Sequence, residues 1–413
     1  MENKLRIAVR KFAPFESAIA KQWEDFERER GSGFTLEPVA FELLPLTEAL
    51  FDNQGLRTGT WDIAFINTDW IAAACHRQEL ADLRKFIQGN PPEDYPHGWT
   101  DSMLRLQQKD GIVAGLPYHD GPECLLFRKD LFESPAEQRA YRAAYGVSLN
   151  PPQSWNEFRR IARFFHRPAH GVYGCVFAAY PDGHNSVYDF LLHLWTRGGT
   201  LQDKQGRFCF HTREAAQALQ FYREMLADTT AVHPKSKTFD SVQCGEAFTK
   251  GEAAMSVNWF GFAAVAEAAV TSAVRARVGV AQIPCEPPHK SVSLNVYWML
   301  SLAAGSQHPE LGYEFIRHCA SKRMDKLLTL EGGIGCRRST WEDPEINQRI
   351  PFYRDLETLH VNAREIPSLT TWPEINHIID AMVSEANSGE RNVEVLLQEA
   401  DERVAQIAAG TPR

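Results

Sequence analysis

The sequence lacks the segments and the composition that mark several protein classes. It has no run of 18 or more apolar residues, which is about the length that a membrane-spanning helix needs, so no integral membrane segment is predicted. The longest apolar stretch, residues 262–274, is short and is interrupted by Glu267. Basic residues are not in excess: 44 Lys and Arg stand against 53 Asp and Glu, for a net charge of −9. This balance argues against a dedicated nucleic-acid-binding protein.

Cysteine is sparse and scattered. No two of the eight cysteines lie within four residues of each other, so the chain has no CxxC pair for zinc or redox chemistry. We expect buried single thiols, and their number favours a reducing compartment. A secretory leader is not evident either, because residues 4–10 already alternate as a strand does. Either the protein is cytosolic or a leader has been removed.

Catalytic and metal-binding motifs are missing as well. We find no GxSxG, HExxH or GxxxxGK[ST] motif, no GxGxxG after a strand, and no EF-hand loop. His166 and His170 have the spacing of a helical metal pair, but Pro168 between them breaks the helix. The sequence therefore predicts no enzyme activity, no catalytic residues, no cofactor and no metal.

What the sequence contains is a chain of 413 residues with ordinary globular composition, enough for two or three compact units. Short apolar or alternating segments at residues 5–9, 34–44 and 61–66 predict strands, and residues 17–30 predict an amphipathic helix. Strands that alternate with helices indicate an α/β unit with a largely parallel sheet. Such sheets bind ligands at the carboxyl ends of their strands.

The middle of the chain has a different pattern. Residues 157–269 are predicted to be mostly helical, after a helix start at which Ser154 and Glu157 have the spacing of a capping box. Two short strands follow, at residues 278–283 and 296–302. A strand this late is expected to complete the first sheet. That arrangement predicts two lobes, a chain that crosses between them more than once, and a ligand cleft where they meet.

Aromatic and polar residues gather at predicted loop ends. These clusters are Asn67-Thr-Asp-Trp70, Tyr118-His-Asp120, Tyr180-Pro-Asp182 with His184-Asn185, Asn258-Trp-Phe-Gly261, Asn295-Val-Tyr-Trp298 and residues 332–338. Sugars offer hydroxyl groups to Asp, Asn and Arg, and an apolar ring face to Trp or Tyr. The clusters therefore favour a carbohydrate ligand.

Six ordered blocks carry a resemblance to a known family. They are GIVAGLPY (111–118) with LFRKDLF (126–132), PQSWNEF (152–158), the Gly-Gly turn at 198–199 with Asp203 and Gly206, FTKGEAAM (248–255), VGVAQIP (278–284) and HPELGYEF (308–315). In this order they resemble the family 1 extracellular solute-binding proteins of ABC transporters, the maltose-binding-protein-like group. Phe127 stands where that family has Tyr.

The resemblance implies a two-lobe periplasmic-binding fold, type II-like, that closes on its ligand at a hinge. Its expected lobes are residues 1–115 plus 284–310 and residues 116–283 plus 311–413. The implied partners are a small-molecule sugar or sugar derivative and the permease subunits of an ABC transporter; we expect a monomer and no nucleic acid. We expect a periplasmic location with the leader removed, the cytoplasm being the alternative.

The resemblance also places candidate ligand-binding residues. It places Lys11, Phe12, Asp69, Trp70, Tyr118, Tyr180, Asp182, Trp259 and Arg337 at the site, and the clusters themselves add Asp120, Asn295 and Trp298. Arg337 could read an anionic group, so a neutral sugar and a sugar acid, sugar phosphate or glycerophosphodiester remain open. A cytosolic carbohydrate sensor of the same fold, or a glycosidase using Asp69 and Asp182, are the alternative functions.

Overall fold

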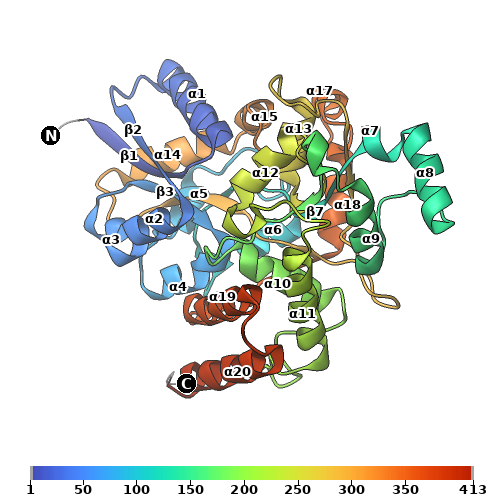
Figure 1. The fold of residues 1–413 in the computed structure, drawn as a ribbon. Helices are drawn as coiled ribbons and strands as arrows, with labels where there is room; N and C mark the ends of the chain where they lie inside the picture. The colour runs from blue at the N-terminus through green and yellow to red at the C-terminus, as the bar shows by residue number, and fades with distance from the viewer. Residues whose placement is uncertain (1–2, 411–413) are drawn as a thin grey trace. The chain divides into compact units, whose positions relative to one another are not determined.

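The protein, seen in a computed structural model that describes residues 3–410, divides into two compact units (Figure 1). Unit 1 comprises the chain up to Gly121, Val296–Arg354 and Ile366–Trp372; unit 2 comprises Pro122–Asn295, Asp355–Glu365 and the chain from Pro373 onwards. The chain therefore passes from one unit to the other several times.

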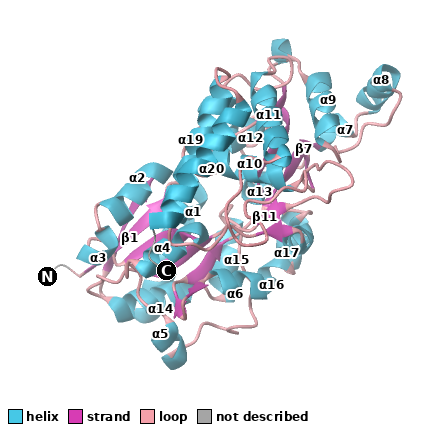
Figure 2. Ribbon diagram, turned by 90° about the horizontal axis from the view of Figure 1, so that it is seen from below, coloured by secondary structure: helices cyan, strands magenta, loops and turns pink. Residues whose placement is uncertain are grey.

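Unit 1 is built on a five-stranded mixed sheet with strands in the order β2-β1-β3-β12-β6 (Figure 2). Its strands are β1 (Lys4–Arg10), β2 (Thr35–Phe41), β3 (Ile63–Asn67), β6 (Leu116–His119) and β12 (Trp298–Leu302). β1 pairs in parallel with β2 and β3, whereas β12 runs antiparallel to both β3 and β6. The late strand thus completes the first sheet, as the sequence predicted.

The helices of unit 1 bury their apolar stripes on this sheet and on each other. Helix α1 (Ala13–Arg30) buries Phe15, Ile19 and Phe26, and it ends at Gly31, whose φ of 61° suits a residue without a side chain. The other helical elements are α2 (Leu43–Thr47), η1 (Glu48–Asp52), α3 (Gly55–Thr58), η2 (Thr68–Trp70), α4 (Ile71–His76), α5 (Arg84–Gly89), α6 (Asp101–Leu106), α14 (Pro309–Cys319), α15 (Lys322–Leu330), α16 (Arg338–Trp341), α17 (Pro344–Arg349) and η5 (Tyr353–Asp355), with a short hairpin of β4 (Gln108–Lys109) and β5 (Ile112–Val113).

The division differs from the expected lobes at three places: residues 116–121 belong to unit 1, residues 284–295 belong to unit 2, and residues 311–354 and 366–372 belong to unit 1. The sequence assigned residues 311–413 to the second lobe, but α14 and α15 both pack against α1, and α14 also contacts β6 and β12. The aromatic rings of Trp23 and Phe26 on α1 meet Phe315 on α14 at 5.0 and 5.5 Å. Residues 296–354 therefore belong to unit 1.

Unit 2 contains a four-stranded sheet with strands in the order β10-β7-β9-β8. The strands are β7 (Glu123–Arg128), β8 (Tyr173–Val176), β9 (Ala253–Trp259) and β10 (Val278–Ala281). β7 runs antiparallel to β9 and β10, and β8 runs parallel to β9. Its helical elements are α7 (Lys129–Phe132), α8 (Pro135–Tyr145), α9 (Trp155–Phe165), η3 (Pro168–His170), α10 (Asn185–Trp195), α11 (Arg213–Ala227), η4 (Ser236–Thr238), α12 (Ser241–Thr249), α13 (Phe260–Ala268), α18 (Leu356–Val361), α19 (Trp372–Ser388) and α20 (Val393–Gly410); β11 (Ser293–Leu294) pairs with β13 (Ala363–Arg364).

Local sequence signals explain how helices of unit 2 begin and pack. The predicted capping box is present: the Ser154 hydroxyl accepts from the Glu157 N–H, and the Glu157 carboxylate accepts from the Ser154 N–H. Helix α9 lies directly on β8. The two backbones approach so closely that a Cβ at Gly174 would overlap the carbonyl group of Ala162. The C-terminal helix α20 lies beside α11 (Figure 1).

All eight cysteines are free thiols, and only Cys209 and Cys285 are not buried. This agrees with the expectation of buried single thiols. In the part of the chain that the structure describes, no helix combines the length and the apolar character that crossing a bilayer requires.

Candidate ligand-binding site

One edge of the unit 1 sheet gathers most of the predicted site residues of that unit. The carboxyl ends of β1, β3 and β6 lie there beside the amino end of β12, since Trp298 pairs with both Asn67 and His119. The predicted residues at this edge, called here the unit 1 edge, are Lys11, Phe12, Asp69, Trp70, Asp120 and Trp298. Sheet topology thus brings together segments that are far apart in the sequence.

An aromatic pair and an acid follow β3. The rings of Trp70 and Trp298 meet edge to face, with centroids 5.5 Å apart, and the Phe51 ring lies 5.7 Å from Trp70. Asn67 caps the single turn η2 by accepting from the Asp69 N–H at 3.4 Å. Asp69 and Trp70 are each 8% exposed, so a carboxylate and an indole lie together in a partly desolvated position.

The loops after β1 and β6 complete this edge. The ammonium group of Lys11 pairs with the Glu42 carboxylate at 2.9 Å, and the Phe12 ring lies 6.4 Å from the ring of His119. Burial lowers the pKa of His119 to about 4, so its imidazole is neutral at pH 7. Its Nδ1 accepts from the Ile334 N–H at 2.9 Å, and the Asp120 N–H donates to the Ile334 carbonyl at 3.0 Å. The segment that carries Asp120 is thus fixed to the segment that carries Ile334.

Two predicted site residues lie in the interior of unit 1. The Tyr118 hydroxyl donates to Gln22 at 3.0 Å, and its ring packs against Phe65. Arg337 is fully buried; its guanidinium donates to the carbonyls of Ala320 and Glu93 and lies 4.4 Å above the Trp99 ring. Each side chain is occupied by internal partners, so we leave Tyr118 and Arg337 out of the site proposed below.

In unit 2 the corresponding edge lies at the end of β9. Trp259 pairs with Glu123 at the start of β7, and the segment after β8 leads to Tyr180 and Asp182. Tyr180 is 43% exposed, whereas Asp182 is 7% exposed and accepts from the His184 N–H at 3.0 Å. We call Tyr180, Asp182 and Trp259 the unit 2 edge.

The Trp259 indole is held in place by residues that sequence reasoning missed. Its Nε1–H donates to the Asn185 side-chain oxygen at 3.3 Å, and the Asn185 amide donates in turn to the Glu123 carboxyl at 3.3 Å. The Tyr188 ring meets the indole edge to face at 5.7 Å. Asn185 lies in a cluster that the sequence had marked, but only the β7–β9 register places Glu123 opposite Trp259. No signal in the sequence reveals that register.

Buried acids lie behind this indole. Burial raises the pKa of the Glu123 carboxyl well above its usual range, and the negative charge of Asp189 adds to the effect. Burial also raises the pKa of Asp189 to about 7, although the Tyr222 hydroxyl donates to it at 2.7 Å. Both acids are buried: Glu123 supports Trp259 through Asn185, whereas Asp189 is held by Tyr222.

Asn295 is the last residue of the first segment of unit 2, and it lies directly after β11. Its backbone N–H donates to the Arg364 carbonyl at 2.8 Å, and the side chain is 3% exposed. Its position is fixed by the β11–β13 pairing rather than by the four-stranded sheet.

Within the described residues, one group of potential metal ligands comes close together: Asp25, Glu29 and His318. The guanidinium of Arg323 forms ion pairs with both of these carboxylates, and Arg28 pairs with Asp25 as well. Their charge is thus already neutralised by protein groups, which explains the cluster without a metal ion.

Comparison with known sequences gives the family. The profile of the bacterial extracellular solute-binding proteins matches residues 47–326, which is more than half of the chain. The chain belongs to this family. Proteins of the family are binding components of transport systems rather than enzymes. Their extracellular placement is consistent with the resemblance that the sequence carries.

Curated relatives are distant. A probable ABC transporter-binding protein of Deinococcus radiodurans is 23% identical over 343 residues, covering 81% of this chain and 77% of the relative. A probable amino-acid ABC transporter periplasmic-binding protein of Sinorhizobium fredii is 23% identical over 279 residues, covering 66% of this chain and 59% of the relative.

Solved structures share the fold over nearly the whole chain. A maltose-bound protein of T. maritima is 20% identical with a TM-score of 0.86, covering 98% of this chain and 99% of that one. A solute-binding protein of Agrobacterium radiobacter in complex with ribitol is 22% identical with a TM-score of 0.86, covering 98% of this chain and 98% of that one. A solute-binding protein of Agrobacterium vitis with bound D-mannitol is 19% identical with a TM-score of 0.86, covering 99% of this chain and 100% of that one. The predicted two-lobe periplasmic-binding fold is confirmed.

Proposed function

We propose that this chain is the solute-binding component of an ABC importer and captures a neutral sugar or polyol by hinge closure. Two observations support the carbohydrate class. The structural neighbours include proteins described with maltose, ribitol and D-mannitol. The predicted site residues of each unit also include at least one indole ring and a buried carboxylate, which suits a ligand with hydroxyl groups and an apolar face.

The observation that carries the proposal is the support of Trp259. The ring is fixed by Asn185 through its N–H and by Tyr188 at its side, so it loses little freedom when a ligand stacks on it. Lys11, Phe12, Asp69, Trp70, Asp120, Tyr180, Asp182, Asn295 and Trp298 are the further residues that we propose for the site. Arg337 was the residue that favoured an anionic sugar derivative as the ligand. Because Arg337 is enclosed in unit 1, we propose a neutral ligand instead.

The test is calorimetric titration of the purified chain with D-mannitol, ribitol, maltose and a wider panel of sugars and polyols. Trp259→Ala should weaken binding of the best ligand by about 10-fold or more, because stacking on an indole contributes about 1.5–3 kcal/mol. Tyr145→Ala is the matched control: this aromatic residue of unit 2 is 41% exposed and lies on α8, so its loss should leave affinity unchanged.

Four outcomes would contradict the proposal or one part of it. Absence of binding across the panel would overturn the carbohydrate class. Equal affinity of Trp259→Ala and wild type would remove Trp259 from the site. Conversion of a bound sugar into product, lost in Asp69→Asn or Asp182→Asn, would favour the glycosidase alternative. Finding the native protein in the cytoplasm would favour the sensor alternative.

A further inference from the structure

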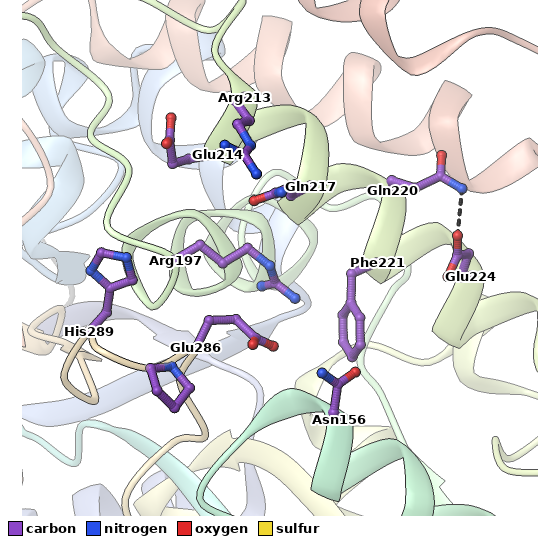
Figure 3. A pocket seen from close by; sticks show the side chains of 11 residues that line it. Asn156, Arg197, Arg213, Glu214, Gln217, Gln220, Phe221, Glu224, Glu286 and His289 are labelled. Atoms are coloured by element: carbon purple, nitrogen blue, oxygen red, sulfur yellow. Dashed lines mark hydrogen bonds between the residues drawn. The ribbon is translucent and has the colours of Figure 1, made fainter.

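A pocket lies within unit 2, and the function proposed above does not use it. It has a volume of about 520 Å³ and is bounded by the start of α9, the end of α10, the first turns of α11 and the loop at residues 286–289 (Figure 3). This volume is in the range of small-molecule sites. Its side chains are mostly polar: Asn156, Arg197, Arg213, Gln217, Gln220 and Glu286 carry the argument below.

The pocket is separate from the unit 2 edge. Helix α10 contributes Asn185 to the support of Trp259 at its first residue, whereas Arg197 lies two residues beyond its last residue, Trp195. A helix of this length spans about 16 Å. The two sites therefore lie at opposite ends of one helix and share no side chain that contacts both.

Arg197 is the unusual feature of the pocket. The side chain is 7% exposed, and its guanidinium lies 4.7 Å from the centre of the Phe221 ring. Its guanidinium lies within hydrogen-bond distance of two atoms of His193, the carbonyl oxygen at 2.9 Å and Nδ1 at 3.4 Å. Among the described residues no carboxylate oxygen lies within 4.0 Å of it. A buried cation without an ion pair is costly, and an anionic ligand group would lower that cost.

An acid faces this cation across the pocket. Figure 3 shows the Glu286 carboxylate pointing toward the Arg197 guanidinium, and Glu286 likewise has no ion pair within the described chain. Glu224 differs, because it is already paired with Arg159 at 3.0 Å and accepts from Gln220 at 2.7 Å. Arg197 and Glu286 thus face each other across the pocket as a cation and an acid, and neither has an ion pair within 4.0 Å among the described residues. Arg213 and Glu214 add one further charge of each sign to the lining.

The wall that carries Glu286 is fixed in place. The Glu286 N–H donates to the Thr196 carbonyl at 2.9 Å, and the Cys285 N–H donates to the Gln153 carbonyl at 2.9 Å. The His289 ring rests on Gly198, where a Cβ would overlap it. These contacts hold the acid at a set separation from Arg197, which preorganises the pair for a ligand that bridges them.

We propose that this pocket binds a free amino acid, with its carboxylate on Arg197 and its ammonium on Glu286. A phosphate or a dicarboxylate is disfavoured, because Glu286 and Glu214 would repel the additional negative charge. The amides of Gln217, Gln220 and Asn156 offer donors and acceptors to a polar side chain. The site is distinct from the one that holds the transported solute.

The test is a calorimetric titration of the full chain with each of the twenty L-amino acids separately. We expect at least one to bind, and its affinity to fall about 10-fold or more when either its ammonium or its carboxylate is removed, since a charge-assisted hydrogen bond contributes about 1.5–3 kcal/mol. For L-glutamine the two analogues are glutaramate and 4-aminobutanamide. Failure of all twenty to bind, or equal affinity of an analogue, would overturn the proposal.

Variants locate the site. Arg197→Met should abolish amino-acid binding, whereas Arg207→Met, which removes an exposed arginine in the same unit, should leave it unchanged. In Glu286→Gln, the amino acid and its analogue without the ammonium group should bind with equal affinity. This variant lies on an exterior loop, so it still tests the proposal if Arg197→Met fails to fold. Binding that survives Arg197→Met but is lost in Trp259→Ala would place the amino acid at the solute site and overturn the proposal.

Discussion

Each unit buries one arginine beside a tryptophan ring, and the two arginines have different partners. Arg337 in unit 1 is fully enclosed, donates to two carbonyls and lies 3.5 Å from the Asp94 carboxylate. Arg197 in unit 2 donates to one residue and opens into a pocket. Both are buried arginines, and their partners and the pocket beside Arg197 separate a structural arginine from one available to a ligand.

The largest expected effect tests this difference through stability. Arg337→Met should lower the free energy of unfolding by about 3 kcal/mol or more, because the carbonyls of Ala320 and Glu93 lose their buried donor. Arg197→Met should cost about 1 kcal/mol or less, since only the His193 carbonyl loses a donor and the Thr196 hydroxyl also approaches it at 3.4 Å. Urea unfolding of the two variants gives the comparison, and equal costs would contradict it.

Buried acids extend the same contrast and predict a pH effect. In unit 1, Asp325 accepts from two backbone N–H groups and the Thr340 hydroxyl. In unit 2, Asp189 has a raised pKa of about 7, so between about pH 4 and 7 the folded protein keeps a proton that the unfolded chain releases. The contribution of Asp189 to the free energy of unfolding is fully present below about pH 4. It falls by about 2–4 kcal/mol in total as the pH rises from about 4 to above 7.

The variant Asp189→Asn isolates this contribution, because an amide oxygen can still accept from Tyr222 but cannot ionise. Urea unfolding at pH 5 and pH 8 should give a smaller loss of stability for the variant than for wild type. Buried histidines such as His119, whose pKa is lowered, act with the opposite sign but contribute equally to both proteins. Parallel pH dependence in the two proteins would show that Asp189 ionises normally.

The sequence predicted those parts of the molecule that depend on neighbours along the chain. The buried apolar run of β3, the amphipathic face of α1 and the Ser154–Glu157 cap all follow from spacing, and each is present. Segments at the ends of predicted strands were also placed well, because parallel strands bring their carboxyl ends to one edge.

Side-chain partners could not be predicted in this way. Arg337 and Tyr118 were expected at the ligand because the resemblance placed them there, yet each finds its partner more than 90 residues away, in Glu93 and Gln22. Glu123 and Arg197 were missed for the same reason. Strand register and helix packing decide whether a polar residue meets a protein group or faces open space, and no local pattern encodes that outcome.

The smallest expected effect compares helix caps near the two arginines. Ser154 begins α9, which carries the Trp155 ring near Arg197, and it forms a reciprocal capping box with Glu157. Ser321 begins α15, which carries Asp325 near Arg337, but it accepts only from the Met324 N–H, at 3.4 Å. Ser154→Ala should therefore lower the free energy of unfolding by about 1 kcal/mol and Ser321→Ala by about half as much.

The reason for this order is the length of the one hydrogen bond that each hydroxyl accepts. Removing the Ser154 hydroxyl frees the Glu157 N–H from a hydrogen bond of 3.2 Å, while the Glu157 carboxylate keeps the backbone N–H groups of Ser154 and Gln153. Removing the Ser321 hydroxyl frees a single donor from a long hydrogen bond. Urea unfolding of both variants measures the difference. A larger loss for Ser321→Ala would mean that the surroundings of Arg337 depend on this cap more than the enclosed contacts of Asp325 indicate.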